Sequence, residues 1–279
     1  MAAKGTLYLC ATPIGNLEDV TLRVLRVLKE ADEVWAEDTR VTRRLLSRYK
    51  INAKLKSCFE HNELIRKEEL VALLNEGKSV AYCSDAGMPA ISDPGAKLVE
   101  ACLENNLKAT VLPGASSVLA ACVLSGFDCS RFAFYGFLPR EKRPREELMH
   151  LIGTSKLPVV LFESPKRLFA TLQELYLLLG EREAAVLREL TKVYEEARRA
   201  PLSELIKAYK EPPKGEIILV LAPSSAQAME LRDEALDLAL MRLLDAGYTN
   251  RDAVNAASLA LNIPKKRLYS RTLMLKRKE

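Results

Sequence analysis

The stretch that decides the fold is residues 78–95, which read Lys-Ser-Val-Ala-Tyr-Cys-Ser-Asp-Ala-Gly-Met-Pro-Ala-Ile-Ser-Asp-Pro-Gly. Residues 79–83 are a short apolar run of the strand type, and a helical pattern after the loop places Leu98, Val99 and Cys102 on one face. In open α/β sheets, ligands bind beyond the carboxyl ends of the strands. A loop so rich in Gly, Pro and Asp at that place predicts the rim of a binding site.

Single residues of this loop suit such a role. Gly87 and Gly95 allow a positive φ or a close approach of the backbone. Pro89 and Pro94 stiffen the loop, so that its shape persists without a ligand. Asp85 follows the strand directly and is expected to point its carboxylate into the crevice. The alternative interpretation is a well-capped connecting loop without a ligand.

Strand and helix patterns alternate on both sides of this stretch. Alternation of this length predicts a mostly parallel sheet that is covered by helices on both faces. The break at residues 113–117, Pro-Gly-Ala-Ser-Ser, is where we expect a hinge between domains. The predicted strands of the first half are 6–11, 33–36, 54–58, 79–83 and 108–112.

The second half reads as another α/β unit, and the chain beyond a linker at 223–228 reads as helix. We therefore predict an α/β domain at 1–114, a second at 115–223 and a helical module at 224–279. The module is expected to hold three helices, the second running from Thr249 to near Asn262 and the basic third following Pro264, as in a helix-turn-helix. A structural cap or dimer element is the alternative. Strands of the second half are predicted near 131–135, 158–162, 184–189 and 216–221.

Composition excludes several classes of protein. The chain has 279 residues, 48% of them hydrophobic and 28% charged, and no apolar run reaches the roughly 18–20 residues of a membrane span. No signal peptide is visible, so a cytoplasmic protein is expected. The six cysteines form no C-x-x-C motif and are predicted to be buried, reduced thiols. Since His61 and His150 are the only histidines, no metal site is expected.

Basic residues gather in three segments, 40–50, 139–145 and 264–279, although the net charge is only +5. Three such segments favour a polyanionic partner. Nucleotide and hydrolase motifs are missing, since the sequence has no G-x-G, no P-loop, no H-E-x-x-H and no G-x-S-x-G. The basic residues predicted to contact the phosphates of such a partner are Arg40, Arg43, Arg44, Lys265, Lys266, Arg267 and Arg271.

Five segments carry a resemblance to a known family. They read Ala-Thr-Pro-Ile-Gly-Asn-Leu-Glu-Asp at 11–19, Ala-Glu-Asp-Thr-Arg at 36–40, Ser-Asp-Ala-Gly-Met-Pro at 84–89, Leu-Pro-Gly-Ala-Ser-Ser at 112–117 and Arg-Glu-Leu-Thr-Lys at 188–192. Through them, residues 5–221 resemble the tetrapyrrole methylase superfamily, and within it the branch that methylates ribosomal RNA, of which a helical tail is also typical. One small departure is Met88, where the family pattern has Thr.

The resemblance implies two α/β domains with S-adenosylmethionine in the cleft between them, and a homodimer. It also implies 2′-O-methylation of a cytidine in the decoding region of 16S rRNA, in the 30S ribosomal subunit. Carried over residue by residue, the cofactor-binding positions are Ile14, Asp85, Gly87, Met88, Ala115, Ser116, Ser117, Phe162, Leu190, Gly215 and Ile217.

Methyl transfer to a ribose requires the hydroxyl to lie in line with the S–CH₃ bond. Because this hydroxyl is only weakly acidic, a base or a nearby cation should help the reaction. The candidates are Glu37, Asp38, Glu163, Glu189 and Lys192, and the sequence does not choose among them. A helix cap with an ion pair is an equal alternative for residues 37–40. Two other functions stay open: a methylase of a small cyclic tetrapyrrole, disfavoured by the basic patches, and a non-catalytic RNA-binding protein, disfavoured by the cofactor loops.

Overall fold

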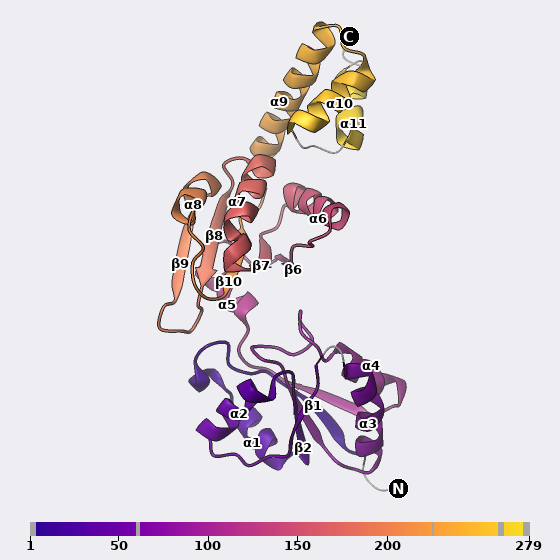
Figure 1. Cartoon of the computed structure of the whole chain (residues 1–279), viewed down its shortest axis with the longest axis vertical. Coiled ribbons are helices and arrows are strands. Elements are labelled where there is room, and N and C mark those ends of the chain that lie inside the picture. Colours follow the sequence, from indigo (N-terminus) through magenta and orange to yellow (C-terminus); the bar gives the residue numbers. More distant parts are fainter. Residues whose placement is uncertain (1–3, 60–61, 225, 262–264, 276–279) are drawn as a thin grey trace. The chain divides into compact units, whose positions relative to one another are not determined.

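The computed structural model describes residues 4–59, 62–224, 226–261 and 265–275 (Figure 1). The chain divides into two compact units. One comprises Met1–Leu148 and Pro158–Ala222, and the other comprises Met149–Leu157 and Pro223–Glu279. Each unit has its own hydrophobic core, and within the described residues the first unit contains two five-stranded sheets.

The first sheet is entirely parallel, in the order β3-β2-β4-β1-β5. The central strand β4 is buried over its whole length, as expected of a strand covered on both faces. The structure thus confirms the parallel α/β sheet predicted from the alternating pattern. Its strands are β1 (Thr6–Cys10), β2 (Glu33–Ala36), β3 (Leu55–Ser57), β4 (Val80–Cys83) and β5 (Lys108–Leu112).

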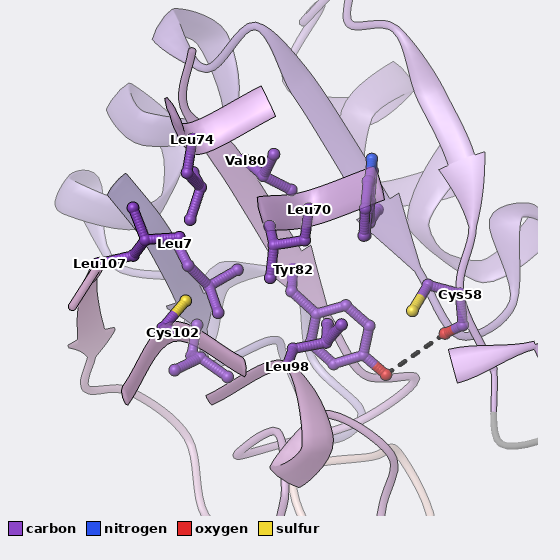
Figure 2. Close-up of a cluster of buried hydrophobic side chains, with 11 residues drawn as sticks. Leu7, Cys58, Leu70, Leu74, Val80, Tyr82, Leu98, Cys102 and Leu107 are labelled. Atoms are coloured by element: carbon purple, nitrogen blue, oxygen red, sulfur yellow. Dashed lines mark hydrogen bonds between the residues drawn. The ribbon is translucent and has the colours of Figure 1, made fainter. Parts of the chain in front are cut away.

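Helices cover both faces of this sheet. On one face, Leu70 of α3 and Leu98 of α4 pack against Leu7 and Tyr82, and the Tyr82 hydroxyl donates a hydrogen bond to the Cys58 carbonyl at 3.4 Å (Figure 2). On the other face, apolar residues of α1 and α2 pack against the alternate side chains of the same strands. These elements are η1 (Leu17–Asp19), α1 (Leu22–Glu30), α2 (Thr39–Arg48), α3 (Glu63–Asn75) and α4 (Ala96–Glu104).

The second sheet is mixed, in the order β6-β7-β10-β8-β9. Strands β6 and β7 pair in parallel, and the other neighbours are antiparallel. The sequence did not predict β9, which reads Glu-Ala-Arg-Arg-Ala-Pro at the sheet edge. The elements are α5 (Ser117–Leu124), β6 (Ala133–Phe137), α6 (Lys142–Thr154), β7 (Val159–Glu163), α7 (Pro165–Leu179), β8 (Glu183–Arg188), β9 (Glu196–Pro201), α8 (Leu202–Ala208) and β10 (Ile217–Leu221).

The second unit contains α9 (Ala226–Asp245), α10 (Asn250–Leu261) and α11 (Lys265–Leu275). Asp252 N donates to Thr249 Oγ1 at 3.2 Å, which is the predicted cap of α10. The predictions for Asn262 and Pro264 fall outside the described residues. The small core of this unit is formed by Leu236, Leu240, Val254, Ala257 and Leu268.

The cysteines are free thiols, and all are buried except Cys129, which is half-buried. The predicted burial is confirmed for five of the six cysteines and is wrong for Cys129. Burial raises the pKa of Cys58 to about 12 and that of Cys102 to about 11. Among the helices that the structure describes, none combines the length and the apolar character needed to cross a membrane.

Candidate functional site

A cavity of about 380 Å³ lies in the first unit, between loops that follow strands of the first sheet and strands of the second sheet. The loop after β4 forms one side, and the start of α5, the end of β7 and the segment before β10 form the others. The wall contains most of the residues predicted to bind the cofactor, although their roles stay predictions. Those that line the cavity are Ile14, Gly87, Met88, Ser116, Ser117, Phe162, Leu190, Gly215 and Ile217.

The two loops that carry the most specific motifs are joined by backbone hydrogen bonds. Thr12 N donates to Gly87 O at 2.9 Å, and Gly87 N donates to Thr12 O at 3.0 Å. Gly87 has a φ of 84°, and a Cβ there would lie 3.3 Å from Ile14 Cγ2 and 3.7 Å from Ala115 O. Ala115 therefore lies close to Gly87 but does not line the cavity. Glycine suits position 87 because it adopts the positive φ and needs no room for a Cβ.

The far end of the β4 loop is fixed by a carboxylate that the sequence did not single out. Glu63 is 4% exposed, and its Oε1 accepts hydrogen bonds from Gly95 N at 2.8 Å and Lys97 N at 3.2 Å. Between these anchors, Ala90 and Ser92 have φ values of 67° and 62°, which cost energy for residues with a Cβ. Strained backbone that its surroundings hold in place is common at functional sites.

Asp85 does not line the cavity wall. Its Oδ1 accepts a hydrogen bond from Asp38 N at 2.9 Å, and its own N donates to Glu37 Oε2 at 3.2 Å. The carboxylate expected in the crevice is thus bound to the backbone at the end of β2. Burial raises the pKa of both Glu37 and Asp85.

Asp93 is the carboxylate of this loop that lines the cavity, and it was not among the residues predicted from the sequence to form the site. Burial raises its pKa to about 7, and the nearby charges of Glu37 and Asp85 act in the same direction. An Asp before a Pro is common in plain turns, so the sequence offered no signal that distinguished this residue. Its proton affinity depends on the desolvation that only the folded loop provides.

Asp38 is placed as a helix cap with an ion pair, as in the alternative interpretation of residues 37–40. Its side chain accepts from Arg40 N at 2.8 Å and pairs with the Arg40 guanidinium at 2.5 Å. Hydrogen bonds from Arg40 lower the pKa of Asp38 to about 2. A carboxylate with so little proton affinity is a weak base, so Asp38 is the least suited of the catalytic candidates.

Glu189 and Lys192 form an ion-paired group beside the cavity. Lys192 Nζ lies 2.9 Å from Glu189 Oε1 and 3.0 Å from Glu216 Oε2. The hydrogen bond from Lys192 lowers the pKa of Glu189. A Cβ on Gly215 would lie 2.2 Å from Glu189 Oε1, so this group fits only against glycine.

Glu163 lines the cavity but is 3% exposed, and its hydrogen-bonding capacity is used locally. Oε1 accepts from Ser164 N at 2.8 Å, and Oε2 accepts from the Thr171 hydroxyl at 2.6 Å. Arg167 Nε lies 3.4 Å from Oε1. The arrangement fixes the start of α7 under the cavity.

The predicted RNA-binding residues lie on two helices. Arg43 and Arg44 are exposed on α2, next to the ion-paired Arg40. On α11, Lys265 is exposed, whereas Arg271 pairs with Asp237 of α9 at 2.5 Å and holds the helical unit together. Lys266 and Arg267 belong to α11, but their side chains lie outside the described residues. Within the described part of the chain, no group of three His, Cys, Asp or Glu is placed to hold a metal ion.

Comparison with known proteins gives concordant matches. The family model described as Tetrapyrrole (Corrin/Porphyrin) Methylases matches residues 6–206. A ribosomal RNA small subunit methyltransferase I from Synechocystis sp. is 40% identical over 274 residues, covering 97% of this chain and 98% of that protein. The protein of the same name from Halalkalibacterium halodurans is 46% identical over 183 residues, covering 66% of this chain and 63% of that protein.

A solved structure shares the fold. Uroporphyrin-III C-methyltransferase from Thermus thermophilus, in complex with S-adenyl homocysteine, superposes with a TM-score of 0.56 over 78% of this chain and 97% of that one. The two sequences are 21% identical, so this likeness concerns the arrangement of the two sheets and their helices.

Proposed function

The chain belongs to the tetrapyrrole (corrin/porphyrin) methylase family, and from this premise we propose that it transfers a methyl group from S-adenosylmethionine to ribosomal RNA. The acceptor is the ribose 2′-hydroxyl of a cytidine in the decoding region of 16S rRNA. The observation that carries the proposal is that four of the five segments that carry the family's motifs, all but 36–40, contribute residues to one cavity. Similarity to ribosomal RNA methyltransferases over nearly the whole chain favours RNA over a tetrapyrrole as the substrate.

The cavity has features that suit S-adenosylmethionine. Its volume lies in the range of ordinary ligand sites, roughly 300–1,000 Å³. Ile14, Phe162 and Ile218 supply apolar walls, and Phe162 packs edge-on against Phe134 with ring centroids 5.0 Å apart. An aromatic wall suits the flat adenine or the sulfonium cation.

The start of α5 suits the amino acid end of the cofactor. Ser116 caps this helix, and Ser116 and Ser117 line the cavity. Free backbone N–H groups and the helix dipole make a helix N-terminus favourable for a carboxylate. When bound, the cofactor supplies the electrophilic methyl group, and the chain supplies position and charge.

Asp93 is the residue best suited to take the proton of the ribose hydroxyl. It lines the cavity, and a pKa of about 7 lets it accept a proton near neutral pH. Glu189 and Lys192 are already paired with each other, so we assign them to holding the segment around Leu190 rather than to proton transfer.

The proposed partner is the 30S subunit, which places the enzyme in the cytoplasm. Arg43 and Arg44 on α2 and Lys265 on α11 are exposed cations that can contact phosphates. We also propose a homodimer. Leu119 and Val123 on α5 are 56% and 80% exposed, and an apolar helix face of this kind is suited to burial against a second copy.

The test is transfer of a labelled methyl group from S-adenosylmethionine to purified 30S subunits, followed by mass spectrometry of 16S rRNA nucleosides. The proposal expects label in 2′-O-methylcytidine. Label in a base would refute it, as would cofactor binding without transfer. Light scattering of the purified protein tests the dimer, and a monomer mass at micromolar concentration would contradict it.

A further inference from the structure

The connection between β8 and β9 carries two exposed side chains at its tip. Glu195 N donates to Lys192 O at 3.1 Å, which closes a four-residue turn with Val193 and Tyr194 at its centre. Val193 is 94% exposed and Tyr194 is 73% exposed. Such positions usually hold Gly, Asn, Asp, Ser or Pro, and neither side chain is buried in the core of the unit.

The turn is held in place by local contacts. Thr191 N donates to Glu195 Oε2 at 2.6 Å, and Lys192 pairs with Glu189 at 2.9 Å. Glu189 and Thr191 have φ values of 53° and 65°, a conformation that a β-branched residue such as Thr rarely adopts. The surroundings therefore impose a particular orientation on the tip, as is common where backbone strain serves a function.

The same segment borders the cavity. Leu190 lines it, and the Thr191 hydroxyl accepts a hydrogen bond from Asn16 N at 3.0 Å. A Cβ on Gly15 would lie 2.8 Å from Leu190 O, so the Thr-Pro-Ile-Gly-Asn loop packs tightly on this segment. The exposed valine and tyrosine thus follow directly on a wall of the proposed methyl-transfer site.

Exposed cations accompany the tip, while the nearby carboxylates of Glu189, Glu195 and Glu216 are held in local ion pairs or hydrogen bonds. Arg198, two residues into β9, is exposed, and so is Lys214, which adjoins the cavity residue Gly215. Proteins hold unpaired nucleotides by stacking bases on aromatic side chains while nearby cations meet the phosphates. Tyr194 is such an exposed ring, on the segment that follows the cavity residue Leu190. Both cations adjoin β8, since Arg198 pairs with Val186 and the Lys214 carbonyl accepts from Arg188.

We propose that Tyr194, with Val193 beside it, is a stacking platform for an unpaired base next to the nucleotide that is methylated. The inference rests on the proposed function, because it presumes an RNA substrate. It adds a residue that selects and holds that substrate. The platform acts on RNA binding and leaves the cofactor site unchanged, since neither side chain lines the cavity.

The test compares Tyr194→Ala, Tyr194→Leu and Tyr194→Phe in methylation of 30S subunits. Loss of one base stack should raise KM for 30S roughly 5- to 150-fold in the Ala and Leu variants. Tyr194→Phe should stay within about 3-fold of the wild type, because the ring remains. The S-adenosylmethionine Kd should be unchanged in all three variants. Leu103→Ala is the matched control, since Leu103 is 72% exposed at the end of α4 and lies outside the cavity wall.

Three results would overturn the inference while the proposed function stands, and two of them concern Tyr194→Ala. One is wild-type methylation with an unchanged KM for Tyr194→Ala. The other is a Tyr194→Ala variant that loses its oligomeric state in light scattering, since this would make the tip a contact between protein copies. Full rescue by Tyr194→Leu would likewise overturn stacking in favour of apolar packing. Failure of the wild type to methylate 30S subunits would instead refute the proposed function.

Discussion

Glu37, Asp85 and Asp93 all have raised pKa values, and burial is the main cause for each. They differ in what their atoms do. Glu37 and Asp85 exchange hydrogen bonds with the backbone between β2 and the β4 loop, whereas Asp93 lines the cavity. Position therefore separates the carboxylates that build the site from the one that can react in it.

The rate of methyl transfer should follow the ionisation of Asp93. Because a base must be deprotonated, kcat/KM for 30S subunits should rise as pH increases and level off above about pH 7, the pKa of Asp93. Asp93→Asn should lower kcat by roughly 10²- to 10⁴-fold and abolish this rise. Stopped assays from pH 5.5 to 9 measure it, with Asp128→Asn as a control at an exposed carboxylate. An unaltered pH profile in Asp93→Asn would assign the proton transfer elsewhere.

The same substitution should stabilise the fold in a pH-dependent way. The pKa of Asp93 is near 7 in the folded protein and near its ordinary 3.8 in the unfolded chain, so this group lowers the stability of the fold as pH rises from about 4 to 7, and the loss is complete above pH 7. Asn stays neutral, so Asp93→Asn should gain about 1–2 kcal/mol of unfolding free energy at pH 8, after allowance for solvent, and nothing at pH 4. Urea titrations at the two pH values measure this, and an equal change at both would contradict the assignment.

At the scale of elements, the cavity depends on short contacts between loops. The Thr-Pro-Ile-Gly-Asn loop meets the β4 loop through two hydrogen bonds at Gly87 and meets the segment after β8 at Gly15. These are contacts between residues distant in the sequence, and they close only if each loop keeps its backbone course. Small residues at the contact points are therefore part of the site's shape.

Gly15→Ala tests this dependence. The added Cβ would lie 2.5 Å from Lys192 Cγ and 2.8 Å from Leu190 O, so one loop must move. We expect S-adenosylmethionine affinity, measured by calorimetry, to fall about 10-fold or more. Gly180→Ala is the control. Gly180 has a φ of +62°, and a Cβ added there would have no atom within 4 Å, so the substitution strains the backbone without touching the cavity. Equal affinities in wild type and Gly15→Ala would show that the loop contact does not shape the site.

The elements that the sequence predicted are those with a clear hydrophobic period. The buried strand β4 and its helix α4 were visible in residues 79–83 and in the spacing of Leu98 and Cys102. Strand β9 was not, because Arg198 and Arg199 are exposed on an edge strand and leave no apolar alternation to read. The mixed pairing of the second sheet likewise follows from long-range contacts that no local pattern contains.

The site shows the same division between local and long-range signals. Glycines such as Gly87 could be predicted, since their conformational need is local. Asp93 and Glu63 could not, because the pKa of Asp93 depends on burial, and the contact of Glu63 with Gly95 joins residues 32 positions apart. The sequence correctly predicted that Asp85 follows β4. The direction of its side chain could not be predicted, because it depends on a hydrogen bond from Asp38 N, which follows β2.

At the scale of the whole molecule, the chain combines an α/β unit that holds the cavity with a helical unit that has a separate core. A cavity walled within the first unit does not need the second for its shape. If the helical unit serves to grip ribosomal RNA, the two activities should separate when that unit alone is destabilised.

Leu268→Ala should achieve this separation. Leu268 is fully buried in the core of the helical unit, and removing a buried leucine side chain costs about 2–5 kcal/mol. We expect S-adenosylmethionine affinity to stay within about 2-fold of the wild type, while methylation of 30S subunits falls sharply. Leu273→Ala on the same helix, at a residue 66% exposed, is the matched control. Calorimetry should first show that the helical unit of the Leu268→Ala protein is unfolded. If this protein then methylates 30S subunits normally, the helical unit has no role in RNA binding.

The distribution of the cysteines gives the molecule a built-in reporter of local opening. All six thiols precede residue 130, so the helical unit carries none. Five are buried, and a buried thiol reacts with an alkylating agent only after the structure around it opens. Peptide mass spectrometry after alkylation measures the reaction rate of each cysteine separately. The rates at Cys10 and Cys83 report opening of the first sheet, and the rate at Cys122 reports opening around α5. Cofactor binding should slow both, and unfolding of the helical unit should leave both rates unchanged.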